Sequence, residues 1–155
     1  MMKSHRIITD PIHIIGIETR TSNQEALITL PRMWQRLFQE NLIAQVPNRI
    51  SSEIYAIYTK YEGDHTRPYT YILGYQVRDL TTIPTGMTGI TIAPASYEVF
   101  TARGRLPDAV VRTWERIWTP EVDSKRAYHT DFEIYGEKAA NQEDGEVEIC
   151  IGITG

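Results

Sequence analysis

The residues best suited to chemistry lie around Glu133, in the segment Asp131-Phe132-Glu133-Ile134-Tyr135. Aromatic and β-branched residues alternate with polar ones there, which predicts a short strand. Side chains at i and i+2 of a strand share a face, so we expect Glu133 beside Asp131 and Tyr135. If that face is enclosed, Glu133 is a carboxylate in an apolar, aromatic site, which is unfavourable unless a partner such as a ligand's cation pairs with it. The alternative is an amphipathic strand whose polar face meets water.

Other patterns that would indicate catalysis or metal binding are missing from the sequence. The four histidines have no metal-binding spacing with one another or with Cys150. His129, Asp131 and Glu133 would share one strand face and could form a row of metal ligands, but such a row is more typical of a solvated strand end. There is no nucleophile elbow, phosphate-binding loop or dinucleotide fingerprint. We therefore expect no metal and no cofactor.

Composition and charge restrict the class of protein. The chain has a net charge of −4 and no run rich in Lys or Arg, which argues against direct nucleic-acid binding. It has no stretch of about 20 apolar residues that could span a bilayer, and its N-terminal apolar run is too short for a signal peptide. The single cysteine, Cys150, cannot form an internal disulfide. These features predict a cytoplasmic protein with no membrane partner.

Hydrophobic periodicity predicts seven strands and two long helices. The strands are expected at 7–20 (bent near Pro11), 53–61, 69–77, 87–93, 96–103, 128–135 and 146–153. One helix is expected over 27–43, with Pro31 either kinking it or marking its true start. The other is expected over 107–118, ended by Pro120.

The order of these elements repeats. Strand, helix, strand, strand occurs over about 7–78 and again over about 96–153. We therefore predict one α+β domain over 1–155, with two such units in a pseudo-twofold arrangement. Their strands would form a mostly antiparallel sheet with both long helices on one face. A groove where two such units meet is a common place for a small ligand.

Tyrosines are concentrated in the predicted strand pair 53–61 and 69–77. Six of the nine tyrosines fall between Tyr55 and Tyr75. A tyrosine supplies an apolar wall with a polar tip, which suits a binding pocket. For a ligand-binding site we predict Glu133 and five aromatic wall candidates: Tyr71, Tyr75, Tyr135, Trp34 and Trp114.

Aromatic, glycine and proline positions along nearly the whole chain form a recognisable order. They are Trp34…Phe38, Tyr55…Tyr58…Tyr61, Tyr69-x-Tyr71-x-x-Gly74-Tyr75-x-Val77, Pro84-x-Gly86, Pro94-Ala95-x-Tyr97-x-Val99-Phe100 with Gly104, Trp114-x-x-Ile117-Trp118 and Phe132-Glu133-x-Tyr135. This order resembles the GyrI-like effector-binding domains of AraC-type and MerR-type bacterial activators. It is also similar to stand-alone drug-binding proteins of that family carried on integron cassettes.

The resemblance implies a function and a site. It implies an aromatic pocket that binds lipophilic cations and other apolar drugs, with a glutamate on its floor at the position of Glu133. Activators of these types also carry a DNA-binding domain of about 100 residues, an ordinary domain size. The chain has no room for one, so direct gene regulation is not expected, while a DNA-binding regulator is left open as a protein partner.

Three functions are compatible with these residues and with the resemblance. The leading one is a stand-alone module that binds a lipophilic cation through Glu133 and aromatic faces. The second is a hydrolase of small electrophilic natural products, as some members of the resembled family are, although no clear second catalytic group accompanies the glutamate. The third is a protein-interaction role like that of a gyrase inhibitor, for which a net charge of −4 is a weak argument.

Overall fold

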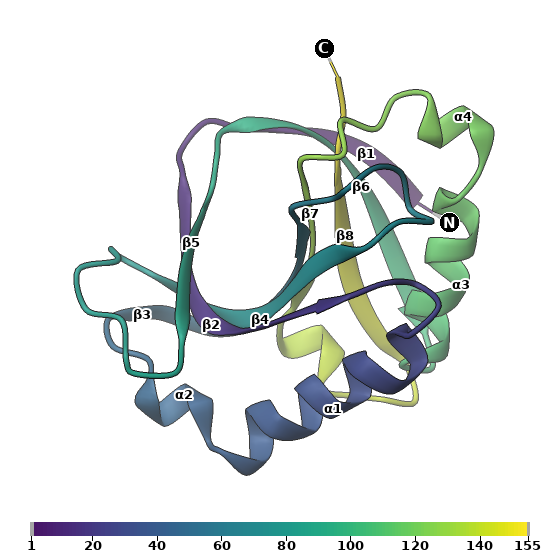
Figure 1. The fold of residues 1–155 in the computed structure, drawn as a ribbon. Coiled ribbons are helices and arrows are strands. Elements are labelled where there is room, and N and C mark those ends of the chain that lie inside the picture. Colours follow the sequence, from purple (N-terminus) through teal and green to yellow (C-terminus); the bar gives the residue numbers. More distant parts are fainter. Residues whose placement is uncertain (1, 155) are drawn as a thin grey trace.

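Eight antiparallel strands form one sheet, and two long helices pack on one of its faces (Figure 1). The computed structural model describes residues 2–154. The strands are β1 (Met2–Ile8), β2 (Ile12–Thr21), β3 (Arg49–Thr59), β4 (Tyr69–Val77), β5 (Thr88–Ile92), β6 (Ala95–Gly104), β7 (Thr130–Tyr135) and β8 (Gly145–Gly152). The helices are α1 (Ala26–Gln39), α2 (Leu42–Gln45), α3 (Asp108–Ile117) and α4 (Pro120–Asp123), with a 3₁₀ turn over Glu137–Ala139.

The predicted α+β fold is confirmed, including the repeated units. The first unit is β2-α1-β3-β4 and the second is β6-α3-β7-β8. Their strands lie in the sheet as β2-β4-β3 and β7-β8-β6, so the equivalent strands β3 and β7 pair at the junction. The edges are extended by β5 beside β2 and by β1 beside β6.

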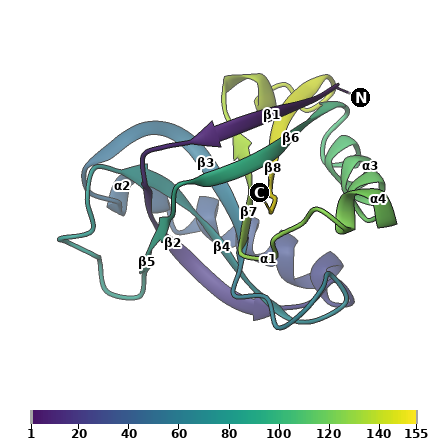
Figure 2. The same cartoon turned by 90° about the horizontal axis from the view of Figure 1, so that it is seen from above.

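The predicted strand over 7–20 is two strands, separated by a corner at Pro11. These two strands form one side of a two-stranded ribbon. The other side is β5, which pairs with β2, and β6, which pairs with β1. Ile8 lies opposite Ala95 before the corner, and Ile12 lies opposite Ile92 after it. Figure 2 shows this bent ribbon, which joins the two ends of the sheet and makes the sheet curl. A proline suits the corner because it supplies no ladder hydrogen bond.

Both helices bury one face against the outside of the curled sheet. Pro31 does not mark the start of α1, because the helix begins at Ala26 and Pro31 lies inside it. The buried residues of α1 are Met33 and Leu37. The predicted single helix to residue 43 is instead interrupted at Asn41, which adopts a left-handed conformation before the short α2. No helix within residues 2–154 is long and apolar enough to cross a bilayer.

Two glycines opposite each other let β2 and β4 approach closely. Gly16 pairs with Gly74 across these strands. A Cβ added at Gly16 would lie 2.0 Å from the carbonyl oxygen of Leu73, and one at Gly74 would lie 2.4 Å from that of Ile15. Both contacts are with backbone, which cannot move aside as a flexible side chain can.

Gly16→Ala and Gly74→Ala should each destabilise the fold. We expect each change to lower the free energy of unfolding by about 1–3 kcal/mol or more, because the new methyl group overlaps backbone of the adjacent strand. Urea denaturation measures this loss. Gly63→Ala is the matched control: a Cβ there meets only the side chain of Arg67, and we expect a change within about 0.5 kcal/mol. Equal urea midpoints for Gly16→Ala and Gly63→Ala would contradict the close-approach explanation.

Candidate functional site

Glu133 is a buried carboxylate near the centre of the sheet. It lies on β7, between Ala56 of β3 and Ile149 of β8. Only 2% of its surface is exposed, so the alternative of a solvated polar face is wrong.

Three neutral groups donate hydrogen bonds to this carboxylate. Tyr58 Oη of β3 and Trp114 Nε1 of α3 donate to Oε2, at 2.9 and 2.6 Å. Tyr135 Oη of β7 itself donates to Oε1 at 2.6 Å. Both oxygens are therefore satisfied, but no positive charge among these donors offsets the negative one.

Aromatic rings surround the donors. Tyr58 packs against Tyr71, Tyr69 and Trp114, with ring centroids 5.1, 5.5 and 5.0 Å away. These rings are buried, and their offset and edge contacts are the favourable ones for aromatic groups.

A second tryptophan reaches the group from the other helix. Trp34 of α1 packs edge-on against Tyr135 at 4.6 Å and donates a hydrogen bond from Nε1 to Tyr71 Oη at 3.0 Å. Trp34 and Tyr135 are both half-buried, so they form the margin of the group nearest to solvent. Each repeated unit thus contributes one helix tryptophan.

Most of the predicted site residues come together. Tyr135 and Trp114 contact Glu133 directly, and Tyr71 and Trp34 lie in the surrounding aromatic layer. Tyr75 is buried further along β4, and no described hydrogen bond or ring contact joins it to Glu133.

Sequence reasoning missed Tyr58 as a site residue. Tyr58 lies two residues after Ala56, which faces Glu133 across β3 and β7, so Tyr58 projects from the same face as the carboxylate. Only the register between the two strands reveals this, and periodicity within one strand does not contain that information.

The surroundings of Glu133 change its protonation equilibrium. Burial raises the pKa of the carboxyl, and the hydrogen bonds from Tyr135, Trp114 and Tyr58 only partly oppose this. Burial, with the charge of Glu133, also raises the pKa of Tyr58 and Tyr135 well above 10, so these hydroxyls stay neutral donors.

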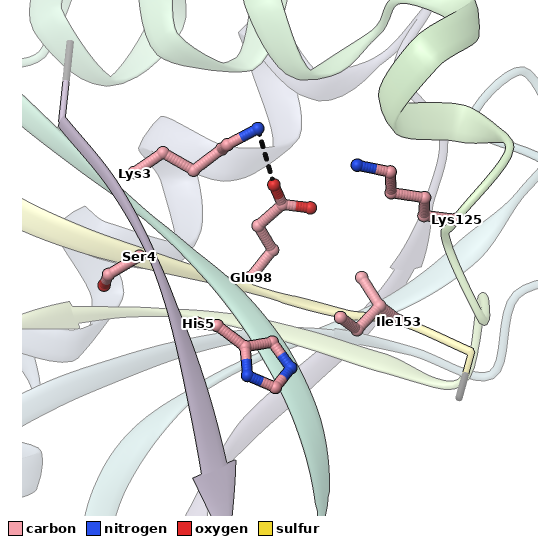
Figure 3. A pocket seen from close by; sticks show the side chains of 6 residues that line it. All are labelled: Lys3, Ser4, His5, Glu98, Lys125 and Ile153. Carbon is pink, nitrogen blue, oxygen red and sulfur yellow. Dashed lines mark ion pairs between the residues drawn. The ribbon is translucent and has the colours of Figure 1, made fainter.

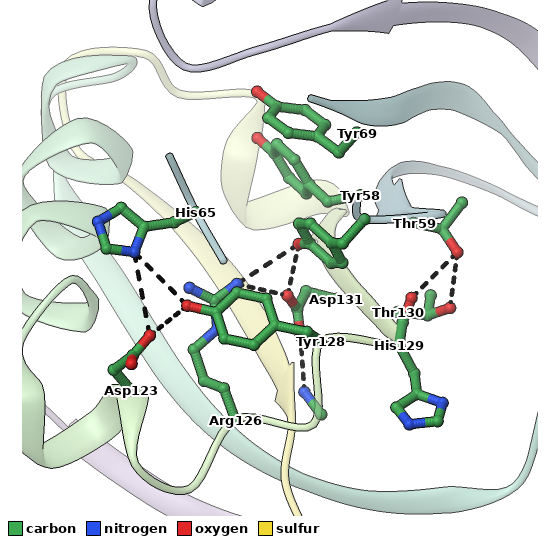
Figure 4. A network of polar contacts seen from close by, with 12 residues as sticks. Tyr58, Thr59, His65, Tyr69, Asp123, Arg126, Tyr128, His129, Thr130 and Asp131 are labelled. Atoms are coloured by element: carbon green, nitrogen blue, oxygen red, sulfur yellow. Dashed lines mark hydrogen bonds and ion pairs between the residues drawn. The ribbon is translucent and has the colours of Figure 1, made fainter. Parts of the chain in front are cut away.

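Asp131, two residues earlier on the same strand face, has the cation that Glu133 lacks (Figure 4). It is fully buried, and its Oδ2 accepts hydrogen bonds from Arg126 Nη2 at 2.7 Å and Tyr61 Oη at 2.5 Å. The Gly152 backbone N–H donates to Oδ1 at 2.8 Å. Burial alone would lower the pKa of Arg126, but the charge and hydrogen bond of Asp131, together with Tyr61 and Tyr128, raise this pKa, so the guanidinium stays charged.

The row formed by His129, Asp131 and Glu133 is therefore not a solvated strand end. Both carboxylates are buried, and only His129 is exposed. Over residues 2–154 no three His, Cys, Asp or Glu side chains are placed to hold a metal ion together.

An open hollow on the surface offers a different environment. It is lined by Lys3, Ser4, His5, Glu98, Lys125 and Ile153 (Figure 3). Its buried carboxylate, Glu98, is already paired with Lys3 at 2.8 Å. This hollow therefore has no carboxylate in the condition of Glu133.

Comparison with known proteins identifies the family. Residues 7–153 match the family described as Cass2, integron-associated effector binding protein. The chain belongs to the Cass2 family. It is also 30% identical, over 97% of both chains, to YobU of Bacillus subtilis (strain 168), provisionally named a transcriptional regulator protein. Membership of the Cass2 family confirms the resemblance to effector-binding proteins of integron cassettes.

Solved structures share this Cass2 fold. The integron cassette protein VCH_CASS2, from the mobile metagenome of Vibrio cholerae, has a TM-score of 0.79 and 24% identity, over 98% of this chain and 95% of that chain. The structure of SAV2435 bound to tetraphenylphosphonium has a TM-score of 0.83 and 22% identity, over 100% and 95%. At these identities the likeness concerns the fold.

The raised pKa of Glu133 predicts how stability depends on pH. A carboxyl whose folded-state pKa is raised contributes stability that is full below its ordinary value of 4.5 and is lost as pH rises through the folded-state pKa. Glu133→Gln should remove this loss, so the variant's unfolding free energy should fall less than the wild type's between pH 4 and pH 8. Glutamine fits because the Tyr135 hydroxyl can turn to accept its N–H.

Urea denaturation across that pH range measures the difference. Glu115→Gln, the same change at an exposed position of α3, is the control and should follow the wild-type profile. Parallel profiles for Glu133→Gln and wild type would mean that Glu133 ionises in the folded protein as it does in the unfolded chain.

Proposed function

We propose that this protein is a stand-alone binding module for lipophilic, drug-like cations, which it holds in the aromatic group around Glu133. The observation that carries the proposal is the contrast on one face of β7. Asp131 is neutralised by Arg126, whereas Glu133 has only neutral donors. A bound cation would supply the missing charge. Membership of the Cass2 family and the tetraphenylphosphonium bound to SAV2435 support this proposal.

Binding requires side chains to move. Because Glu133 is 2% exposed, a ligand reaches its carboxylate only after part of the aromatic group shifts. Trp34 and Tyr135 are the half-buried members, so we propose that entry occurs past them. A ligand shifts the protein toward this open arrangement only as far as its affinity for the open arrangement exceeds its affinity for the closed one. Each well-placed ring contributes about 0.5–2 kcal/mol of cation–π attraction to that difference.

The hydrolase alternative has less support from the geometry. A glutamate that activates water needs a free oxygen directed at that water. Both oxygens of Glu133 instead accept hydrogen bonds from three side chains, an arrangement suited to holding a charge in place. For the regulator-like role suggested by the name of YobU, we propose a separate DNA-binding protein as partner.

Glu133→Gln should weaken the binding of cations more than the binding of neutral ligands. We expect methyltriphenylphosphonium to bind 10- to 100-fold more weakly, the loss of a charge-assisted contact worth about 1.5–3 kcal/mol. The affinity for triphenylphosphine oxide, a neutral compound of similar size and shape, should change little. Calorimetric titration or tryptophan quenching measures both affinities.

Glu98→Gln is the matched control, because Glu98 is also buried but is paired with Lys3. It should leave both affinities unchanged. Equal losses for the two ligands in Glu133→Gln would mean that Glu133 shapes the site without selecting charge, and unchanged cation affinity would refute the proposed function.

A further inference from the structure

Arg126 is a cation built into the same aromatic cluster. Its guanidinium lies 4.2 Å from the ring centroid of Tyr128, 5.8 Å from that of Tyr61 and 5.9 Å from that of Trp114. The Tyr128 hydroxyl is held by the Asp123 carboxylate, which fixes this ring over the guanidinium (Figure 4). These three rings thus accommodate a planar cation, and one of them, Trp114, also contacts Glu133.

The two buried carboxylates belong to one continuous group. Trp114 joins them, because its indole N–H bonds Glu133 while its ring lies near Arg126. Asp131 and Glu133 are also two residues apart on one strand face, or about 6.6 Å along the strand. With Glu133 ionised, the buried charges of this group are two negative and one positive, so its net charge is −1.

Burial makes the Arg126–Asp131 ion pair a weak source of folding stability. The side chains of both residues are almost fully buried, at 1% and 0% exposure. Replacing such a buried pair by apolar residues is often neutral or stabilising. Moreover, Nε and Nη1 of Arg126 are buried without a hydrogen-bond partner in the described part of the chain. Stability alone is therefore a weak explanation of the pair, and we consider its effect on the charge of the site.

We infer that Arg126, by cancelling the charge of Asp131, makes the site selective for ligands with a single positive charge. This inference rests on the proposed function. A monocation is matched by Glu133. The second charge of a compact dication would find Asp131 already paired and Arg126 repelling it. Arg126 is thus a specificity-determining residue that acts through the charge it cancels at Asp131, two residues from Glu133, without contacting the ligand.

Three biaryl compounds of one shape and different charge test this inference. They are 4-phenylpyridine, neutral at pH 8, the monocation 1-methyl-4-phenylpyridinium and the dication 1,1′-dimethyl-4,4′-bipyridinium. Their affinities are measured by calorimetry at pH 8 for the wild type, Arg126→Met, Asp131→Asn and the double variant. The wild type should bind the monocation at least tenfold more tightly than the dication.

The variants change the net charge in opposite directions. Arg126→Met makes it −2 and should shift the monocation-to-dication ratio at least tenfold toward the dication. Asp131→Asn makes the net charge zero and should weaken the binding of both cations, that of the dication more. The double variant restores −1 and should return the ratio to the wild-type value. If Arg126→Met does not fold, Asp131→Asn and the double variant carry the test.

An unchanged ratio in all the folded variants would overturn the inference and leave the pair a structural one. Glu133→Gln separates this failure from failure of the proposed function. If Glu133→Gln still weakens the binding of the monocation, the proposed cation binding is supported and only the role of Arg126 is refuted. If it changes no affinity, both proposals fail.

Discussion

A carboxylate buried without a cation is the constraint on which the rest of the site depends. Glu133 keeps both oxygens hydrogen-bonded, but only to neutral tyrosine and tryptophan groups, and burial raises its pKa. Its hydrogen bonds make burial of the carboxylate compatible with folding, and a nearby positive charge would stabilise it further. The aromatic rings around it add cation–π attraction and exclude water.

The fold produces this arrangement through its repeated units. Pairing of the equivalent strands β3 and β7 places Glu133 near the middle of the sheet, where the helices cover it. Helix α3 brings Trp114 to the carboxylate, and α1 brings Trp34 to the margin. The same pairing brings Tyr58 to Glu133 from the neighbouring unit. The site therefore exists only when both halves are folded together.

Local patterns were enough to predict most of the elements, but not the breaks at Pro11 and Asn41 or every contact between elements. Alternation in β7 correctly placed Glu133 and Tyr135 on one face, and the repeated element order correctly predicted the antiparallel sheet with two long helices. Tyr58 was missed because its position depends on cross-strand register. The Arg126 partner of Asp131 was missed because Arg126 lies in an irregular segment after α4, where no periodicity indicates direction. Burial of Glu133 depends on helices distant in sequence, so only the family resemblance indicated it.

The protonation of Glu133 itself tests the central claim most directly. Carbon-13 NMR of selectively labelled glutamate side chains, assigned with Glu133→Gln, gives the pKa of this carboxyl in the free protein and with tetraphenylphosphonium bound. We predict a value raised above 4.5 in the free protein that falls when the cation binds, and that does not fall with triphenylphosphine oxide. An ordinary pKa in the free protein, or one that the cation leaves unchanged, would contradict the claim that Glu133 is a buried carboxylate awaiting a cation.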